Sequence, residues 1–218
     1  MKKRVVIAFI LLILLTTIST KQKIIFSNFH VTKIEIHNNI LISEREIVKL
    51  LNPILDKNII FLKNAEIEKL LLQNTFIESF NVKKKYPNII KIKIFEKQPI
   101  AILFDKKKKY YLSKKIELIE FNNMNNFKNL PYVFGNKSEF KVLYNNLAKI
   151  DFPFDKIKRY TLFGVNRWDL ETIDNSTIRL PPKNYTKSLK NYLDLMNKKE
   201  FRKYKVFDYR INNQLILK

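Results

Sequence analysis

Residues 70–103 read LLLQNTFIESFNVKKKYPNIIKIKIFEKQPIAIL, and this stretch decides the fold. Apolar residues alternate with polar ones on both sides of Tyr86-Pro87-Asn88, a tripeptide typical of a turn. The pattern predicts two strands, 76–84 and 90–95, joined by that turn. A further strand is expected at 100–104, after Pro99.

The residues before this stretch predict one strand and two helices. Residues 31–36 alternate as a strand does. Ser43 and Glu46 form a capping box ahead of apolar residues at helical spacing, and Asn64 is expected to cap a second helix. The order strand, helix, helix, strand, strand over residues 29–98 predicts an α+β domain whose helices cover one face of a three-stranded sheet.

Residues 99–218 predict a second domain, a mixed and mostly antiparallel β-domain with flanking helices. Helices are expected at 137–150 and 185–196, where apolar residues recur at helical spacing. Strands are expected at 100–104, 110–112, 116–121, 157–163, 166–171, 177–181 and 206–211, with residues 214–218 closing the chain.

The first 26 residues predict a membrane anchor. A basic tip, residues 1–4, precedes the unbroken apolar run VVIAFILLILL at 5–15, which favours insertion by roughly 3–5 kcal/mol. We expect a transmembrane helix over 5–26, with the anchor residues Val5, Phe9, Leu12 and Leu15 facing lipid. A cleaved signal peptide has the same basic start and apolar core, and a buried core helix is a third interpretation.

The composition restricts the chemistry. The chain has no cysteine, only two glycines and no Gly-rich phosphate loop, so neither thiolate metal sites nor nucleotide binding is expected. His30 and His37 flank Glu35 but lack a defined third ligand, so no metal site is expected. The pattern predicts no catalytic residue, no cofactor and no small-molecule substrate.

The formal net charge is +22, from 42 lysines and arginines against 20 acidic residues. Such a charge favours an anionic partner such as nucleic acid, anionic lipid or cell wall. The lysines are scattered along the chain, however, among many Ile and Asn residues, as a coding bias would scatter them. The clusters at 83–85 and 106–109 adjoin turns and are predicted to be solvated, and no nucleic acid is expected as a partner.

The order of elements after an apolar segment resembles a POTRA domain, a small module of membrane-tethered assembly proteins. Within residues 70–103, Tyr86-Pro87 and the segment 96–101, EKQPIA, resemble the bacterial cell division family FtsQ/DivIB. The later segments LPYVFG (130–135), WDL (168–170), IRLP (178–181) and VFDYRI (206–211) resemble that family's β-domain in the same order.

The resemblance implies a non-enzymatic scaffold of the division machinery. It would lie in the cell inner membrane as a single-pass protein, with its N-terminus in the cytoplasm and its bulk in the periplasm. It would bind and position division membrane proteins of the FtsB/FtsL type during septum formation.

The resemblance also implies a site, with residues 206–218 as the main partner strand. A partner strand would add to the edge of the sheet by β-augmentation. A plain edge protected by Arg210 and Lys218 is the alternative, and Trp168 is chiefly expected in the core. The predicted partner-binding residues are Trp168, Asp208, Tyr209, Arg210, Ile211, Asn213 and Leu215.

Two other functions fit the residues. One is another POTRA-containing envelope protein that serves outer-membrane assembly or secretion. The other is an enzyme or cell-wall binder of the envelope whose positive charge attracts its target.

Overall fold

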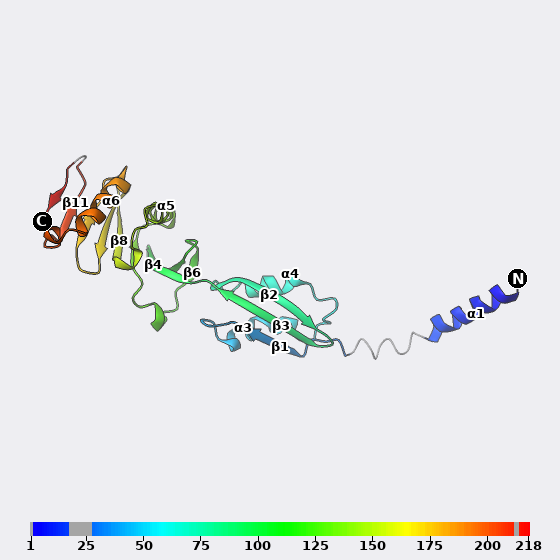
Figure 1. Cartoon of the computed structure of the whole chain (residues 1–218). Coiled ribbons are helices and arrows are strands. Elements are labelled where there is room, and N and C mark those ends of the chain that lie inside the picture. Colours follow the sequence, from blue (N-terminus) through cyan, green and yellow to red (C-terminus); the bar gives the residue numbers. More distant parts are fainter. Residues whose placement is uncertain (1, 18–27, 212–213) are drawn as a thin grey trace. The chain divides into compact units, whose positions relative to one another are not determined.

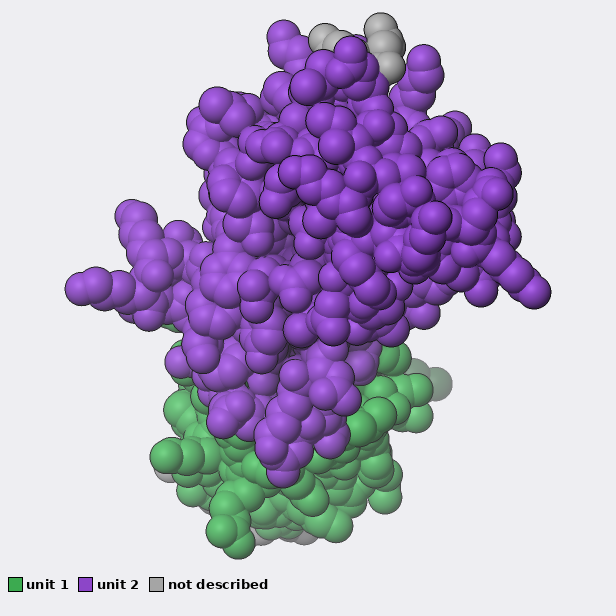
Figure 2. Space-filling view, turned by 90° about the vertical axis from the view of Figure 1, so that its left-hand side faces the viewer, with its two compact units in different colours: residues 1–97 green, residues 98–218 purple. Residues whose placement is uncertain are grey.

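The computed structural model describes residues 2–17, 28–211 and 214–218. The chain divides into two compact units, residues 1–97 and 98–218 (Figure 2). Both contain helices and strands, so the predicted α+β class is confirmed (Figure 1).

The helix α1, Lys2–Thr17, contains the apolar run. The side chains of Val5, Phe9, Leu12 and Leu15 are all exposed on it. In the part of the chain that the structure describes, no helix has both the length and the apolar content needed to span a membrane. Residues 18–26 of the predicted anchor lie outside the described residues, so the anchor stays a prediction.

Within residues 28–97, three strands form a sheet of order β1-β3-β2. β2 and β3 form an antiparallel hairpin around the turn at Tyr86 and Pro87, whose peptide bond is cis, and β1 lies parallel to β3. The elements are β1 Lys33–His37, α3 Glu44–Leu51, a 3-10 turn Asn52–Ile54, α4 Asn64–Leu71, β2 Ile77–Lys85 and β3 Ile89–Glu96.

The core of this unit lies between the helices and one face of the sheet. Ile90, Ile92 and Ile94 of β3 are fully buried, together with Ile47 of α3 and Ile67 of α4. Successive residues of a strand point to opposite faces of the sheet. The residues that alternate with these isoleucines therefore point to the other face, which is open.

Of the two helix caps predicted from the sequence, the structure confirms one and contradicts the other. The Ser43 side chain accepts a hydrogen bond from the backbone N–H of Glu46 at 3.3 Å, so the predicted cap of α3 is confirmed. The predicted cap of α4 is wrong. Asn64 is the first helical residue, and Lys63 holds the cap position without a side-chain hydrogen bond.

Glu96, the last residue of β3, fixes the segment between β1 and α3. Its two carboxylate oxygens accept hydrogen bonds from the backbone N–H groups of Ile40, Leu41 and Ile42, at 2.7–3.1 Å. A carboxylate is suited to this position because it only accepts hydrogen bonds. Glu96, the first residue of the EKQPIA segment, therefore connects the end of the first unit to the segment between β1 and α3.

In the second unit, the described residues contain a nine-stranded sheet of order β12-β11-β10-β9-β8-β7-β4-β5-β6. The neighbours β4–β7, β7–β8 and β10–β11 are parallel, and the other pairs are antiparallel. The strands are β4 Pro99–Asp105, β5 Lys108–Ser113, β6 Leu118–Glu120, β7 Tyr132–Phe134, β8 Ile157–Phe163, β9 Arg167–Thr172, β10 Thr177–Arg179, β11 Val206–Asp208 and β12 Ile216–Leu217.

Two helices connect parallel neighbours in this sheet. α5, Lys137–Ala148, joins β7 to β8, and α6, Tyr185–Met196, joins β10 to β11. Parallel strands require such long crossovers, since a tight turn cannot join them. Phe140 of α5 and Leu189 of α6 belong to one buried cluster with Trp168 and Phe207 of the sheet. Both helices therefore cover the same face.

Glu96→Gln should loosen the segment at residues 38–42. The amide places a donor where two acceptors are needed, which costs about 2 kcal/mol locally and corresponds to roughly 30-fold faster amide exchange. Hydrogen–deuterium exchange of the full chain in detergent, read at residues 40–42, measures the effect. Glu68→Gln, at an exposed position of α4, is the matched control. Unchanged exchange at residues 40–42 in Glu96→Gln would show that the carboxylate does not hold this segment.

Candidate partner-binding edge

The region predicted as one partner strand, residues 206–218, contains two strands. β11 ends at Asp208 rather than 211, and the chain returns antiparallel to it as β12. In the order of the described strands, β12 is last and β11 is interior, between β10 and β12. The edge therefore belongs to β12. Asn213 lies outside the described residues.

Trp168 lies in the core of the second unit. It is 3% exposed, and its ring packs edge-to-face on Phe140 with the ring centroids 6.2 Å apart. A Cβ atom added to Gly135 would lie 3.0 Å from the Trp168 ring and 2.9 Å from Leu162 Cβ. Residue 135 must therefore be glycine for the ring to occupy this place.

Tyr209 is bound on both its backbone and its side chain. Its N–H donates to the Arg179 carbonyl at 2.8 Å, and its hydroxyl donates to Asn191 Oδ1 at 2.9 Å. Burial, reinforced by the nearby Tyr192, raises the pKa of the Tyr209 hydroxyl. These contacts attach β11 to β10 and to α6, so neither polar group of Tyr209 faces a partner.

Asp208 is the centre of a charge cluster on the open face of the sheet. The Arg210 guanidinium donates to both of its carboxylate oxygens at 2.6–2.9 Å, and Arg179 Nη1 lies 3.5 Å from Oδ2. The hydrogen bond from Arg210 is the main reason why the pKa of Asp208 is lowered. Asp208 is 5% exposed, so its pairing fixes the end of β11.

The cluster continues across the sheet to β9. The register aligns Asp169, Arg179 and Asp208 on three adjacent strands, so charges of opposite sign alternate. Arg167 Nε lies 3.3 Å from Asp169 Oδ1, yet both atoms are buried without a hydrogen bond. Burial raises the pKa of Asp169, against the lowering effect of Arg167 and Arg179. Sequence analysis missed this row, because strand order is not visible in a single sequence.

The backbone of β12 presents unused groups at the edge. Val206 and Lys218 exchange two hydrogen bonds, Val206 N–H to Lys218 O at 2.9 Å and Lys218 N–H to Val206 O at 3.1 Å. Backbone groups alternate in direction along an antiparallel strand, so the N–H and C=O of Leu217 point away from β11. This pattern is what an added strand pairs with.

Apolar side chains surround the same edge. Ile216 is 40% exposed and Ile211 is 51% exposed, whereas Leu215 and Leu217 pack partly against the core. Arg210 is also exposed beside them. Of the predicted site residues, the structure thus brings Arg210, Ile211 and Leu215 to the edge.

The other sheet edges of the described chain are better protected. β2 carries three lysines at 83–85, and charged side chains discourage strand addition. β1 is the other edge of the first sheet, and its Ile34 and Ile36 are buried. β6 ends the second sheet on the side opposite β12, and its Ile119 is fully buried. β12 is therefore the edge with the most apolar exposure.

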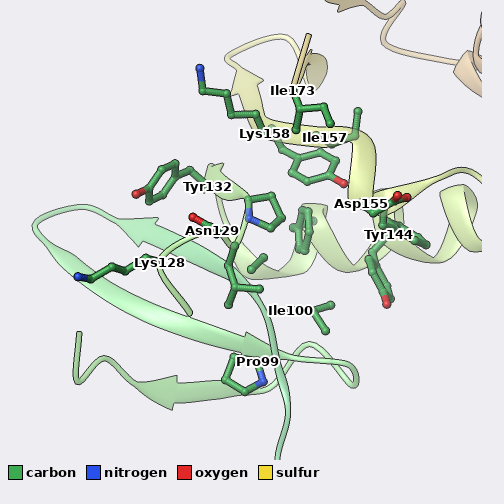
Figure 3. Close-up of a pocket in the computed structure, with 16 residues that line it drawn as sticks. Pro99, Ile100, Lys128, Asn129, Tyr132, Tyr144, Asp155, Ile157, Lys158 and Ile173 are labelled. Atoms are coloured by element: carbon green, nitrogen blue, oxygen red, sulfur yellow. The ribbon is translucent and has the colours of Figure 1, made fainter. Parts of the chain in front are cut away.

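A cavity of about 710 Å³ lies elsewhere in the second unit, and Figure 3 shows its lining. Its walls are mainly apolar and aromatic, including Ile100 and Tyr144. The ammonium groups of Lys128 and Lys158 point away from it (Figure 3). A ligand site needs a few polar groups that converge on the ligand, and these two do not supply them.

The two histidines do not lie in a metal-binding cluster. His37 is at the end of β1, opposite Lys93, and His30 bridges to Asn58. Among the described residues, no three His, Cys, Asp or Glu side chains are grouped so that they can hold a metal ion.

Two family models match the chain. The model "POTRA domain, FtsQ-type" matches residues 29–97, and the model "Cell division protein FtsQ/DivIB, C-terminal" matches residues 101–210. The second match alone covers half of the chain.

Curated relatives agree with these models. The chain is 32% identical over 184 residues to the cell division protein FtsQ of Rickettsia conorii, a match that covers 79% of this chain and 66% of the relative. It is 24% identical over 203 residues to FtsQ of Agrobacterium fabrum, covering 91% and 64%. The chain thus spans slightly less than two thirds of these relatives.

The solved structures that match include the major extracytoplasmic domain of the cell division protein DivIB from Geobacillus stearothermophilus. The match is 13% identical with a TM-score of 0.32, and it covers 45% of this chain and 89% of the other. A TM-score this low does not establish a shared fold.

Asp208→Asn should destabilise the second unit by about 1 kcal/mol at neutral pH, because the charged pair with Arg210 is lost. The folded pKa of Asp208 is lowered, so the pair stabilises the unit above the unfolded pKa of about 3.9. This stability is lost as the pH falls through the folded pKa, so the gap between wild type and variant should close there. Urea unfolding at a series of pH values, followed by fluorescence of the single tryptophan, Trp168, measures both the destabilisation and its pH dependence.

The control for this experiment is Asp194→Asn, at an exposed position of α6. It should leave the urea midpoint unchanged. A gap between wild type and Asp208→Asn that stays constant down to pH 2 would contradict the role of the carboxylate.

Proposed function

The chain belongs to the FtsQ/DivIB family of bacterial cell division proteins, and we propose that it is a membrane-anchored, non-enzymatic scaffold of the division machinery. In this role it binds other division membrane proteins and positions them during septum formation. The mechanism is binding and orientation, without a chemical step.

The exposed edge of β12 is the observation that carries this proposal. It combines outward backbone groups at Leu217 with exposed apolar side chains at Ile211 and Ile216. A strand from a partner gains hydrogen bonds from the backbone and apolar contact from the side chains. The ion pairs of the buried Asp208 with Arg179 and Arg210 hold β11 in place next to this edge.

The partner is a small coiled-coil division protein of the FtsB type, associated with one of the FtsL type. Its extended segment adds to β12 as a tenth strand of the sheet. Arg210, Ile211, Leu215, Ile216 and Leu217 contact it, whereas Asp208, Tyr209 and Trp168 support the edge from inside.

The anchor places this edge outside the cytoplasm. Residues 5–26 span the inner membrane once, the basic tip at 1–4 stays in the cytoplasm, and the rest lies in the periplasm. The exposed apolar side chains along α1 support this arrangement. The POTRA domain, residues 29–98, connects the anchor to the β-domain, residues 99–218.

Leu217→Pro should weaken partner capture at least about fivefold. Proline removes the outward N–H and leaves a partner carbonyl without its donor, at a cost of about 1–3 kcal/mol. Intramolecular pairing is kept, because the bonds of β12 to β11 run through Lys218. Copurification with the FtsB/FtsL-type pair from membranes measures the loss.

Leu118→Pro on β6 is the matched control. The Ser113 N–H donates to the Glu117 carbonyl, so by the alternation of an antiparallel pair the N–H of Leu118 points outward from the opposite edge of the sheet. Like Leu217, Leu118 packs its side chain partly on the core. Capture should be normal in this variant. A folded Leu217→Pro chain that retains the pair would refute the edge assignment.

A photo-reactive residue at Ile216 should crosslink to the FtsB-type protein in living cells, because a strand added to β12 passes within reach of this side chain. The same residue at Val142, which is exposed on α5, should not. Crosslinking at Ile216 to outer-membrane assembly components instead would support the rival envelope function.

A further inference from the structure

The apolar run at residues 58–62 of the first unit is only partly used by the core. Ile59 is fully buried and Leu62 is 4% exposed, whereas Ile60 is 40% and Phe61 is 70% exposed. Exposed apolar side chains that lie next to one another are a mark of protein or membrane interaction sites. The family resemblance and the partner edge leave these two residues without a role.

Other features gather around this loop. Ile59 N–H donates to the Phe29 carbonyl at 2.7 Å, and Lys84 Nζ donates to the Leu62 carbonyl at 2.6 Å. The exposed ring of Tyr86 lies 6.2 Å from that of Phe29. The loop, the β2–β3 turn and the start of the unit therefore form one end of it, which we call the entry tip. Figure 1 shows the β2–β3 turn at the end where β1 begins.

Lysines surround the entry tip. Lys33, Lys63, Lys83 and Lys85 are exposed, and Lys57 pairs with Glu66 at 2.7 Å. On the open face, Lys83 lies directly opposite Lys91, an arrangement that costs stability because like charges face each other. On the same face, Glu35 is paired with Lys91 and Lys33, which lower its pKa to about 2. In the register of the sheet, Lys83 is opposite Lys91 and Lys85 is opposite Ile89.

We propose that the entry tip docks on the membrane surface, with Ile60, Phe61 and Tyr86 at the lipid interface and the lysines on anionic phospholipid headgroups. Aromatic and aliphatic side chains ringed by lysine are the combination that such an interface accepts. Charge complementarity favours anionic lipid over neutral lipid.

Chain length makes this docking efficient. This step rests on the proposed anchor. With residues 5–26 in the bilayer, only residues 27 and 28 separate the anchor from Phe29, and the Cα atoms of residues 26 and 29 lie at most about 11 Å apart. A tether of this length keeps the tip at a high effective concentration near the bilayer, so a weak surface affinity suffices. Docking then restricts the orientation of the first unit over the membrane.

Because the chain has no cysteine of its own, a single introduced cysteine can be labelled at a chosen position. The full chain carries a single label at Ile60→Cys and is reconstituted in vesicles that contain nitroxide-labelled headgroups. With equal amounts of phosphatidylcholine and phosphatidylglycerol at 50 mM salt, quenching of the label is expected. A label at Ile40→Cys, 78% exposed and beside Glu96 at the far end of β3, should remain unquenched.

Two sets of variants separate the contributions in the chain labelled at residue 60. Phe61→Ser should lower the ratio of docked to undocked protein at least tenfold, whereas Ile40→Ser should not change it. Gln at Lys63, Lys83 and Lys85 together should lower it about 100-fold, since each basic residue near an anionic surface contributes about a factor of five. Gln at Lys107, Lys108 and Lys114, which are exposed in the second unit, is the charge-matched control.

The outcomes are distinct. Equal quenching at residues 60 and 40, or equal loss in both lysine sets, would overturn docking by the entry tip. Loss of lipid contact on adding purified cell wall, with the same lysine dependence, would identify a wall polymer as the partner and overturn the lipid proposal. Flotation with phosphatidylcholine vesicles at 500 mM salt tests the anchor separately, because the tip contributes little there. A chain that fails to float would refute the anchor of the proposed function.

Discussion

Two parallel strands cannot be joined by a tight turn, and this constraint organises the second unit. The chain between β7 and β8, and again between β10 and β11, must cross over one face of the sheet, and α5 and α6 make those crossovers. With both helices on one face, Trp168 and Phe207 are enclosed there. The charged row of Asp169, Arg179 and Asp208 is left on the other face. The strand that follows the second crossover, β11, is then paired on its far side by β12, which becomes the edge.

Local patterns were sufficient for most individual elements. The strand at 157–163 and the helix at 185–196 were predicted to the residue. The region after Val206 was harder. Residues 206–211 read as one strand, but the chain leaves the sheet after Asp208, where the carboxylate binds the N–H and guanidinium of Arg210. A side chain that captures its own backbone in this way competes with strand pairing.

The candidate site was predicted only in part. The sequence predicted the site within residues 206–218. Which of these residues are buried and which are exposed depends on the strand order. Tyr209 is held by Asn191, and Asp208 is held by Arg179, both residues far away in the sequence. The lysine cluster at 83–85 gives a similar lesson. It was predicted to be wholly solvated, yet the strand period turns Lys84 toward the helices, where it donates to Leu62, while its two neighbours face outward.

The pairing of β1 with β3 has a consequence for the order of events during synthesis. Ile34 and Ile90 are direct neighbours in the sheet although 55 residues separate them in the chain, whereas β2 and β3 join across a short turn. The hairpin can form as soon as it is made, but β1 must wait for it. The carboxylate of Glu96, the last residue of the sheet, is what holds the segment after β1 in place. The first unit is therefore complete only when nearly all of it has left the ribosome, just before the second unit begins to emerge.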